Sequence, residues 1–217
     1  MSDSIRRHFN PVAIAYLLPL AAAGAAAAQP IASCQDPVPP SIGFALGKSA
    51  PSLGLDRGVV DPGTGSVQVY GGPQFIGRAD VSPAGIFRVR LEASTAQWAV
   101  QRKIYDPNAG YQEVADISEG HIAARFVGAT AGLRLGRGPV CAHILAGGGV
   151  HKLNYRGAGL TAPGFMIVAG VELPAGSRGV VQIDVQLQLI QTNSRYPISG
   201  STVPAASLTA GWAFRFR

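Results

Sequence analysis

Apolar and polar residues alternate one by one over long stretches of this 217-residue chain. The clearest stretch is 181–189, where valine, isoleucine or leucine occupies every second position and glutamine or aspartate stands between them. Because successive side chains of a β-strand point to opposite faces, this pattern predicts strands with one apolar face. After residue 28, no segment carries apolar residues at helical spacing over three turns. The chain is therefore predicted to be all-β.

Eight segments carry this alternation. They are residues 66–77, 85–94, 97–106, 121–135, 139–154, 163–173, 179–191 and 205–216. The connections near 95–96 and at 136–138 and 174–178 are short, and those at 78–84, 107–120, 155–162 and 192–204 are longer. Short turns at one end and longer loops at the other are typical of transmembrane barrels. We therefore predict an eight-stranded antiparallel up-and-down transmembrane β-barrel.

The composition indicates what the two faces of these strands contact. Charged residues make up only 14% of the chain, whereas about 25% is usual in soluble proteins. The second face is rich in glycine, alanine, serine, threonine and glutamine, which suits the narrow interior of a small barrel. The apolar face would then contact lipid, and closure of the barrel leaves no unpaired strand edge there. The net charge of +6 includes no basic run, so nucleic acid is not an expected partner.

The residues before the predicted barrel divide into two parts. Residues 1–28 combine Arg6 and Arg7 with an apolar stretch that ends in alanines, which is typical of a cleaved signal peptide. Residues 29–64 are dense in proline and glycine, so we expect a periplasmic leader there and the barrel at 65–217. An extra hairpin from 41–46 and 53–55 would raise the number of strands to ten.

Cys34 and Cys141 are the only cysteines. In the oxidising compartment that export implies, a disulfide between them would tether the leader to the barrel mouth. The alternative is a lipidated Cys34, because the residues Ile31, Ala32 and Ser33 before it resemble a lipobox. No cluster of cysteine and histidine has zinc spacing, so neither a metal nor a cofactor is expected.

The C-terminal segment carries a more specific pattern. Gly211 is followed by aromatic residues at alternate positions, Trp212, Phe214 and Phe216. This ending resembles the C-terminal assembly signal of bacterial outer-membrane proteins. Residues 131–135 and 145–150 are similar to the central hairpin of the small outer-membrane β-barrel domain family, of the opacity and OmpA-transmembrane-domain type. The resemblance implies a location in the outer membrane, insertion by the barrel-assembly machinery and no enzymatic activity.

An eight-stranded barrel has an interior that side chains fill. With the polar face turned inward, basic and acidic side chains must pair there, because an unpaired buried charge is costly. The predicted lumen network consists of Arg88, Arg90, Glu92, Lys103, Arg134, Glu172, Asp184 and Arg215. Such a network would plug the lumen, and the alternative is a narrow pore that conducts ions past the same charges.

Three basic residues, Arg102, Arg125 and Lys152, fall on the predicted lipid-facing side near the outer ends of their strands. At that level they would contact the phosphates of lipopolysaccharide, and a basic side chain on the lipid face costs little folding free energy there. The alternative for Arg125 is a β-bulge that turns it inward. The expected aromatic girdle of the lipid face consists of Phe75, Trp98, Phe165, Trp212, Phe214 and Phe216.

The leading hypothesis is a small monomeric outer-membrane barrel with a structural, envelope-integrity or surface-interaction role. Residues 107–120, an acidic stretch, form its longest predicted outer loop. One alternative is a narrow pore, and another is a soluble periplasmic lipocalin-like binding barrel with its apolar face inside. The third is a lipid-modifying enzyme with His151 at the outer rim. No serine is linked to that histidine by a motif, so no catalytic residue is assigned.

Overall fold

The computed structural model describes residues 34, 38–51, 65–83, 85–106, 108, 112–136, 139–192 and 202–216. These residues form nine β-strands: β1 (Val38–Pro51), β2 (Gly65–Tyr70), β3 (Gly72–Ser82), β4 (Phe87–Asp106), β5 (Gln112–Leu135), β6 (Cys141–Tyr155), β7 (Ala158–Ala175), β8 (Gly179–Gln191) and β9 (Thr202–Arg215). In the part of the chain that the structure describes, no helix is long and apolar enough to cross a membrane.

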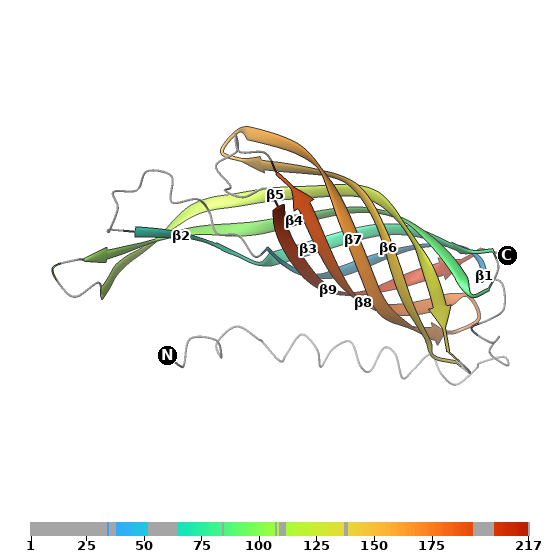
Figure 1. Cartoon of the computed structure of the whole chain (residues 1–217). Helices are drawn as coiled ribbons and strands as arrows, with labels where there is room; N and C mark the ends of the chain where they lie inside the picture. Colours follow the sequence, from blue (N-terminus) through green and yellow to red (C-terminus); the bar gives the residue numbers. More distant parts are fainter. Residues whose placement is uncertain are drawn as a thin grey trace.

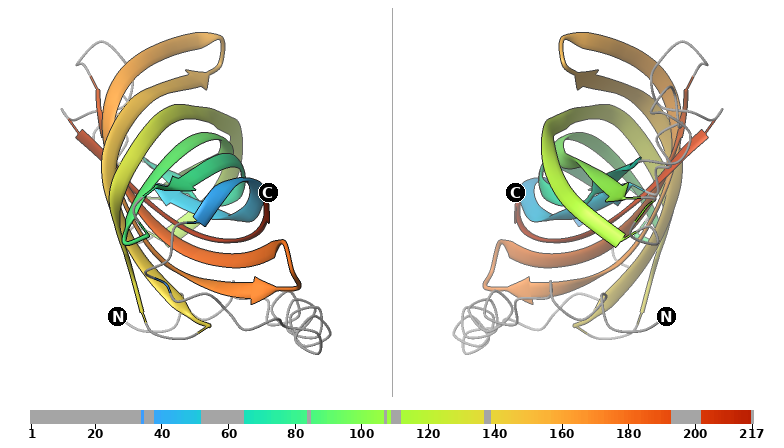
Figure 2. Two further views of the ribbon diagram at one scale, coloured as in Figure 1. Left: turned by 90° about the vertical axis from the view of Figure 1, so that its right-hand side faces the viewer. Right: turned by 90° about the vertical axis from the view of Figure 1, so that its left-hand side faces the viewer.

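Eight of the strands close a ring. They follow the order β4-β3-β1-β9-β8-β7-β6-β5, and a pairing of β5 with β4 completes the circle. All these pairs are antiparallel, and Figure 1 and the end views in Figure 2 show the tilted strands of the wall. β2 lies just before β3 in the chain and pairs with the far part of β4. The predicted eight-stranded antiparallel barrel is confirmed.

Two predicted strand boundaries are wrong, and the two errors cancel in the strand count. Residues 38–51, expected in the leader, form β1 between β3 and β9, so the barrel begins at Val38 instead of residue 65. The predicted turn near 95–96 is absent, because β4 continues through it as one strand of 20 residues. That segment has none of the glycine, proline, asparagine or aspartate residues that form turns. The first half of the alternative extra hairpin lies in β1, and its second half lies outside the described residues.

The connections also differ from the predicted rhythm. β3 extends to Ser82 inside the predicted loop 78–84, and β5 begins at Gln112 inside the predicted loop 107–120. β6 and β7 are joined by a tight turn at Arg156 and Gly157, which both have positive φ angles. The connections from β3 to β4, β5 to β6 and β7 to β8 share one end of the barrel with Cys34 and Phe216. We call this the inner end, since short turns face the periplasm in such barrels.

At the opposite, outer end, part of the wall projects beyond the ring (Figure 1), and there β2 pairs with β4 and β4 with β5 as a three-stranded sheet. We call this sheet, formed by β2 and residues 101–106 and 112–120, the outer arm. It is possible because β4 and β5 are 20 and 24 residues long. The register of these two strands shifts between Val100 and Gln101, and this irregularity marks the place where the arm leaves the wall.

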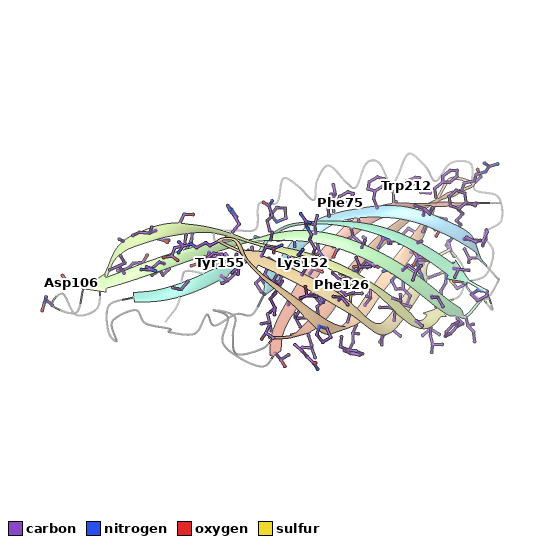
Figure 3. The ribbon with its side chains drawn as sticks, turned by 90° about the horizontal axis from the view of Figure 1, so that it is seen from above. Phe75, Asp106, Phe126, Lys152, Tyr155 and Trp212 are labelled. Carbon is purple, nitrogen blue, oxygen red and sulfur yellow. A yellow bond between two sulfur atoms is a disulfide. The ribbon has the colours of Figure 1, made fainter. Side chains whose placement is uncertain are left out.

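Large apolar side chains cover the outside of the wall. Among them, Val127 is 66% exposed, Leu91 58% and Phe44 53%. The same belt includes Ile42, Leu46, Leu133, Ile144, Val150, Ile183, Val185, Leu187 and Leu208. Phe75 and Trp212 also lie on the outside, as Figure 3 shows. An apolar exterior over a polar interior is the arrangement of a barrel that is solvated by lipid.

The expected aromatic girdle needs one correction. Phe75, Phe165, Trp212, Phe214 and Phe216 are exposed on the wall, but Trp98 is only 1% exposed and lies in the lumen. Because β4 has no turn, the alternation that turns Arg88 and Arg90 inward continues to Trp98.

Candidate functional site: a sealed lumen and its two rims

The inner half of the lumen contains a set of buried charged side chains, which we call the lumen cluster. Its members are Arg78, Asp80, Arg88, Arg90, Arg134, His143, Glu172 and Asp184, none of them more than 7% exposed. They come from β3, β4, β5, β6, β7 and β8, so six wall strands turn at least one of these residues inward. The cluster therefore links separate parts of the wall through its interior.

Asp184 forms ion pairs with three residues, more than any other carboxylate of the cluster. Its Oδ2 accepts a hydrogen bond of 2.8 Å from Nη1 of Arg90 and another from Arg78. Its Oδ1 lies 2.9 Å from Nε2 of His143. Because β8 and β4 are opposite each other in the ring of eight, the bond to Arg90 crosses the lumen.

Two further carboxylates bind the remaining arginines. Asp80 accepts from Nε of Arg88 at 3.0 Å and from Nε of Arg90 at 2.8 Å. Glu172 forms ion pairs with Arg88 and, at 2.8 Å, with Nε of Arg134. Each charged residue of the lumen cluster thus has a charged partner, which offsets the desolvation of both groups.

The structure brings five of the eight predicted network residues together in the lumen cluster: Arg88, Arg90, Arg134, Glu172 and Asp184. Glu92 is also buried and accepts a hydrogen bond of 3.0 Å from Gln186. Arg215 lines the inner mouth beside Glu172. Lys103 differs from the prediction. It lies on the outer arm, where its Nζ is 2.8 Å from Oε2 of Glu113, because β4 extends beyond the ring.

The sequence reasoning missed Arg78 and Asp80, because it placed 78–84 in a loop. The signal that could have found them is the buried phase of β3, which runs through Gln74, Ile76, Arg78, Asp80 and Ser82. From residue 78 to 82 a polar residue stands at every second position, with an alanine and a valine between, which is the same period as in the neighbouring strands.

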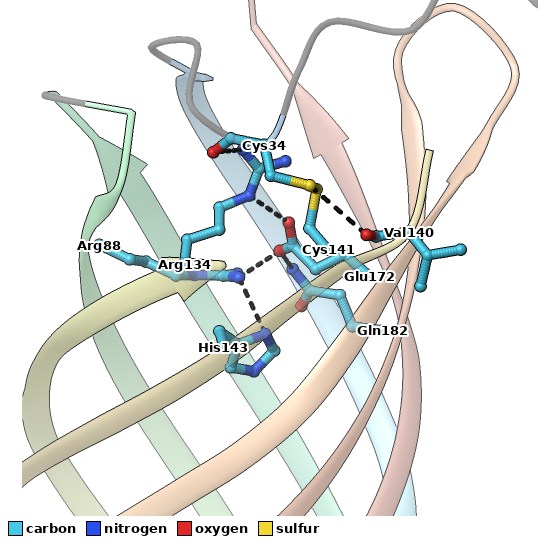
Figure 4. The surroundings of a disulfide bond; sticks show 8 residues. All are labelled: Cys34, Arg88, Arg134, Val140, Cys141, His143, Glu172 and Gln182. Carbon is cyan, nitrogen blue, oxygen red and sulfur yellow. Dashed lines mark hydrogen bonds and ion pairs between the residues drawn. A yellow bond between two sulfur atoms is a disulfide. The ribbon is translucent and has the colours of Figure 1, made fainter. Parts of the chain in front are cut away.

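Cys34 lies at the inner mouth, where it forms a disulfide with Cys141 of β6. The residue is fully buried, and its carbonyl accepts a hydrogen bond of 2.9 Å from Nη1 of Arg134 (Figure 4). β1 begins only four residues later, at Val38, and lies opposite β6 in the ring. The disulfide therefore joins the N-terminal end of β1 to the opposite side of the mouth.

Gly136 makes room for this disulfide. It has a φ of +138°, and a Cβ at this position would lie 3.1 Å from Sγ of Cys34 and 2.7 Å from the carbonyl oxygen of Val140. A larger residue would strain the backbone and crowd the sulfur.

The outer half of the lumen is filled by apolar side chains, which we call the apolar plug. It consists of Ala96, Trp98, Val100, Ile122, Ala124, Leu153, Leu160, Ala162, Ile190, Val203 and Ala205. Phe126 and His151, with ring centroids 4.6 Å apart, lie inside the wall between the plug and the lumen cluster. An ion that passed the lumen cluster would then have to cross this apolar layer.

On the outer side of the apolar plug, the carboxylate of Glu119 contacts three polar side chains of the outer rim. Glu119 lies 2.5 Å from Nε of Arg102 and 3.4 Å from Nη2 of Arg156, and it accepts a hydrogen bond from the Tyr155 hydroxyl. Arg102 is therefore paired at the rim, on the inward phase of β4, and not on the lipid-facing side as predicted. The cause is again the missing turn near 95–96.

Arg125 and Lys152 do lie on the outside of the wall. Both side chains are exposed, and the two residues are directly opposite each other on β5 and β6. The register between these strands is unshifted from Ala123 to Leu135, so no bulge turns Arg125 inward.

The first three residues of the predicted C-terminal signal, Gly211, Trp212 and Phe214, lie on β9, which pairs with β1 and closes the ring. Trp212 and Phe214 face outward from this strand, and Phe216 follows it. Gly211 allows the two strands to approach, because a Cβ there would lie 2.1 Å from the carbonyl oxygen of Phe44.

No protein-family model matches the sequence, and no curated protein matches it either. Solved structures with a similar fold include Neisserial surface protein A, with 14% identity, a TM-score of 0.53 and coverage of 82% of this chain and 97% of that one. Another is the outer membrane protein OprG from Pseudomonas aeruginosa, with 12% identity, a TM-score of 0.55 and coverage of 85% and 99%. This chain has the fold of the small bacterial outer-membrane β-barrel proteins.

Proposed function

We propose that the protein is an integral, monomeric barrel of the bacterial outer membrane, with a sealed lumen and a structural or surface-interaction role. The observation that carries this proposal is the apolar belt. On β5 the outward-facing residues between Arg125 and the inner end are Val127, Ala129, Ala131, Leu133 and Leu135. The ten-residue separation from Arg125 to Leu135 spans about 33 Å along the strand. At a tilt of about 40° it covers about 25 Å of membrane, the height of the apolar band of such barrels.

The same observation argues against a soluble lipocalin-like barrel. Such a barrel would bury its apolar phase and expose its polar one, whereas here Asp184 and Arg90 are fully buried and Val127 is 66% exposed. In water, an exposed belt of this extent would cause association.

The filling of the lumen supports a closed barrel instead of a pore. The lumen cluster joins opposite strands by ion pairs, and the apolar plug follows it toward the outside. In planar bilayers we expect the purified protein to give no conductance steps above the lipid baseline. Regular steps from the wild-type protein would favour the narrow pore.

We propose no enzymatic activity. His151, the candidate at the outer rim, is only 1% exposed and packs against Phe126 inside the wall. A lipid head group at the membrane surface would not reach its ring. The outer arm is the better candidate for a function, because it projects beyond the ring and carries exposed Glu113, Asp116 and Ile117. We infer that partners outside the cell contact this arm.

The location is tested by fractionating cells and running the membrane fraction with and without boiling. We expect the protein in the outer-membrane fraction, with a faster mobility before boiling, since a closed barrel is compact. Insertion should depend on the barrel-assembly machinery, which would act on the β9 residues Trp212 and Phe214. A freely soluble periplasmic product would overturn the proposal.

A further inference from the structure

Two adjacent basic side chains point away from the barrel toward the membrane. Arg125 of β5 and Lys152 of β6 are direct cross-strand neighbours, and both are exposed. The Cβ atoms of such neighbours are about 5 Å apart, and like charges in this arrangement destabilise a sheet.

No acidic side chain of the described residues neutralises this pair. Neither Arg125 nor Lys152 takes part in an ion pair there, whereas Arg102, Lys103 and Arg156 all do. Glu119 is already engaged by Arg102 and Arg156. The pair therefore favours an anion from outside the described chain.

The position of the pair identifies the level of that anion. Arg125 lies at the outer limit of the apolar belt on β5, about 25 Å above Leu135. On β6, Lys152 likewise ends a run of outward-facing small or apolar residues that begins at Ala142 and ends at Val150. Both charges are thus at the level of the head groups of the outer leaflet.

Hydroxyl groups extend the pair on both sides. In the register of the sheet, Thr95 of β4 is opposite Arg125, and Thr161 of β7 is opposite Lys152. All four side chains are exposed on the outer face, and we call them the cation row. A guanidinium, an ammonium and two hydroxyls together provide the donors that a phosphate accepts, with arginine able to donate two parallel bonds.

We propose that the cation row binds a phosphate group of lipopolysaccharide in the outer leaflet. The apolar residues directly below the two charges, Val127 and Val150, would contact the acyl chains of the same molecule. This contact favours a phosphate that is carried by a lipid over a soluble one. The proposal rests on the proposed location in the outer membrane and adds a defined lipid site to it.

The test compares the double variant Arg125→Gln/Lys152→Gln with the wild-type protein in detergent titrations with purified lipid A. Lys48→Gln is the matched control, because Lys48 is an exposed basic residue of β1 whose cross-strand neighbours, Pro73 and Leu208, are uncharged. We expect the dissociation constant to rise at least tenfold in the double variant and less than twofold in the control. Equal affinities of the double variant and the wild type would overturn the proposal.

Two further arms identify the source of the phosphate. Dephosphorylated lipid A should bind the wild type and the double variant equally weakly, and millimolar inorganic phosphate should not displace lipid A. Displacement by phosphate would contradict a lipid site. Heat-modifiable mobility and outer-membrane fractionation of each variant are recorded in parallel. A wild-type protein outside the outer membrane refutes the location, whereas a correctly inserted double variant with unchanged affinity refutes only the site.

Discussion

Asp184 is the residue whose replacement tests the lumen cluster most directly. It is fully buried and binds Arg78, Arg90 and His143. Arg90 also pairs with Asp80, but Arg78 has no other carboxylate partner among the described residues. In Asp184→Asn the side chain keeps its shape, yet Arg78 loses its only ion pair among the described residues and stays buried.

Removal of one partner of a buried ion pair costs about 3–5 kcal/mol, mainly because the other charge stays buried. We therefore expect the free energy of unfolding of Asp184→Asn to fall by that amount. The measurement is reversible urea unfolding in lipid vesicles, followed by the fluorescence of the two tryptophans. Trp98 lies in the lumen and Trp212 on the lipid side, so they report on both faces of the wall.

A second variant separates the charge effect from a general loss of packing. In Arg78→Met/Asp184→Asn the uncompensated charge is gone, while Arg90 keeps its bond to Asp80. We expect this double variant to be more stable than Asp184→Asn by about 1 kcal/mol or more, a coupling usual for contacting residues. If the two losses simply add, or if Asp184→Asn unfolds like the wild type, the cluster does not stabilise the barrel as argued.

Three further changes probe other parts of the barrel. The disulfide closes a loop with a sequence separation of 107, so the reduced protein or Cys34→Ser/Cys141→Ser should lose up to about 4.7 kcal/mol; equal urea midpoints with and without reductant would contradict this. Trp98→Ala empties the centre of the apolar plug and should cost about 3–5 kcal/mol in the same unfolding assay; a loss below 1 kcal/mol would mean that the plug is loosely packed. Gly211→Val places side-chain atoms against the carbonyl of Phe44 at the seam between β9 and β1, so the heat-modifiable form should be lost on gels; a normal mobility shift would show that the seam tolerates a side chain.

The alternation of apolar and polar residues was sufficient to predict the barrel and the direction of its faces. From Ile183 to Leu189 of β8 every second residue is apolar and exposed, and the prediction placed Gln182, Asp184 and Gln186 correctly in the lumen. The outward positions of Arg125 and Lys152 followed from the same period. The ion-pair partners could not be predicted from this period, because the pairing of Asp184 with Arg90 depends on which strands are opposite each other in the ring.

β1 was missed because its inward face lacks charge. Its buried residues are Ser41, Ala45, Ser49 and Pro51, and glycines stand between them on the same face. A single lysine interrupts the apolar residues of the opposite, exposed face. Small residues at these positions leave room for the arginines of the lumen cluster and for Trp98, whose Nε1 donates to Ser49. The proline and glycine content that suggested an irregular leader therefore reflects a strand that faces large side chains across the lumen.

The error in β4 has a related origin, the change in the lumen from charged to apolar. The inward phase of this strand begins with Arg88, Arg90 and Glu92 and continues with Trp98 and Val100, all nearly or fully buried. A strand that crosses from the lumen cluster into the apolar plug must change the polarity of its inward face, although its backbone does not turn. The sequence pattern then resembles two strands of opposite phase, and the small residues between them resemble a turn. A switch of phase without glycine, proline, asparagine or aspartate is thus the sequence signature of a lumen whose two halves are filled with different chemistry.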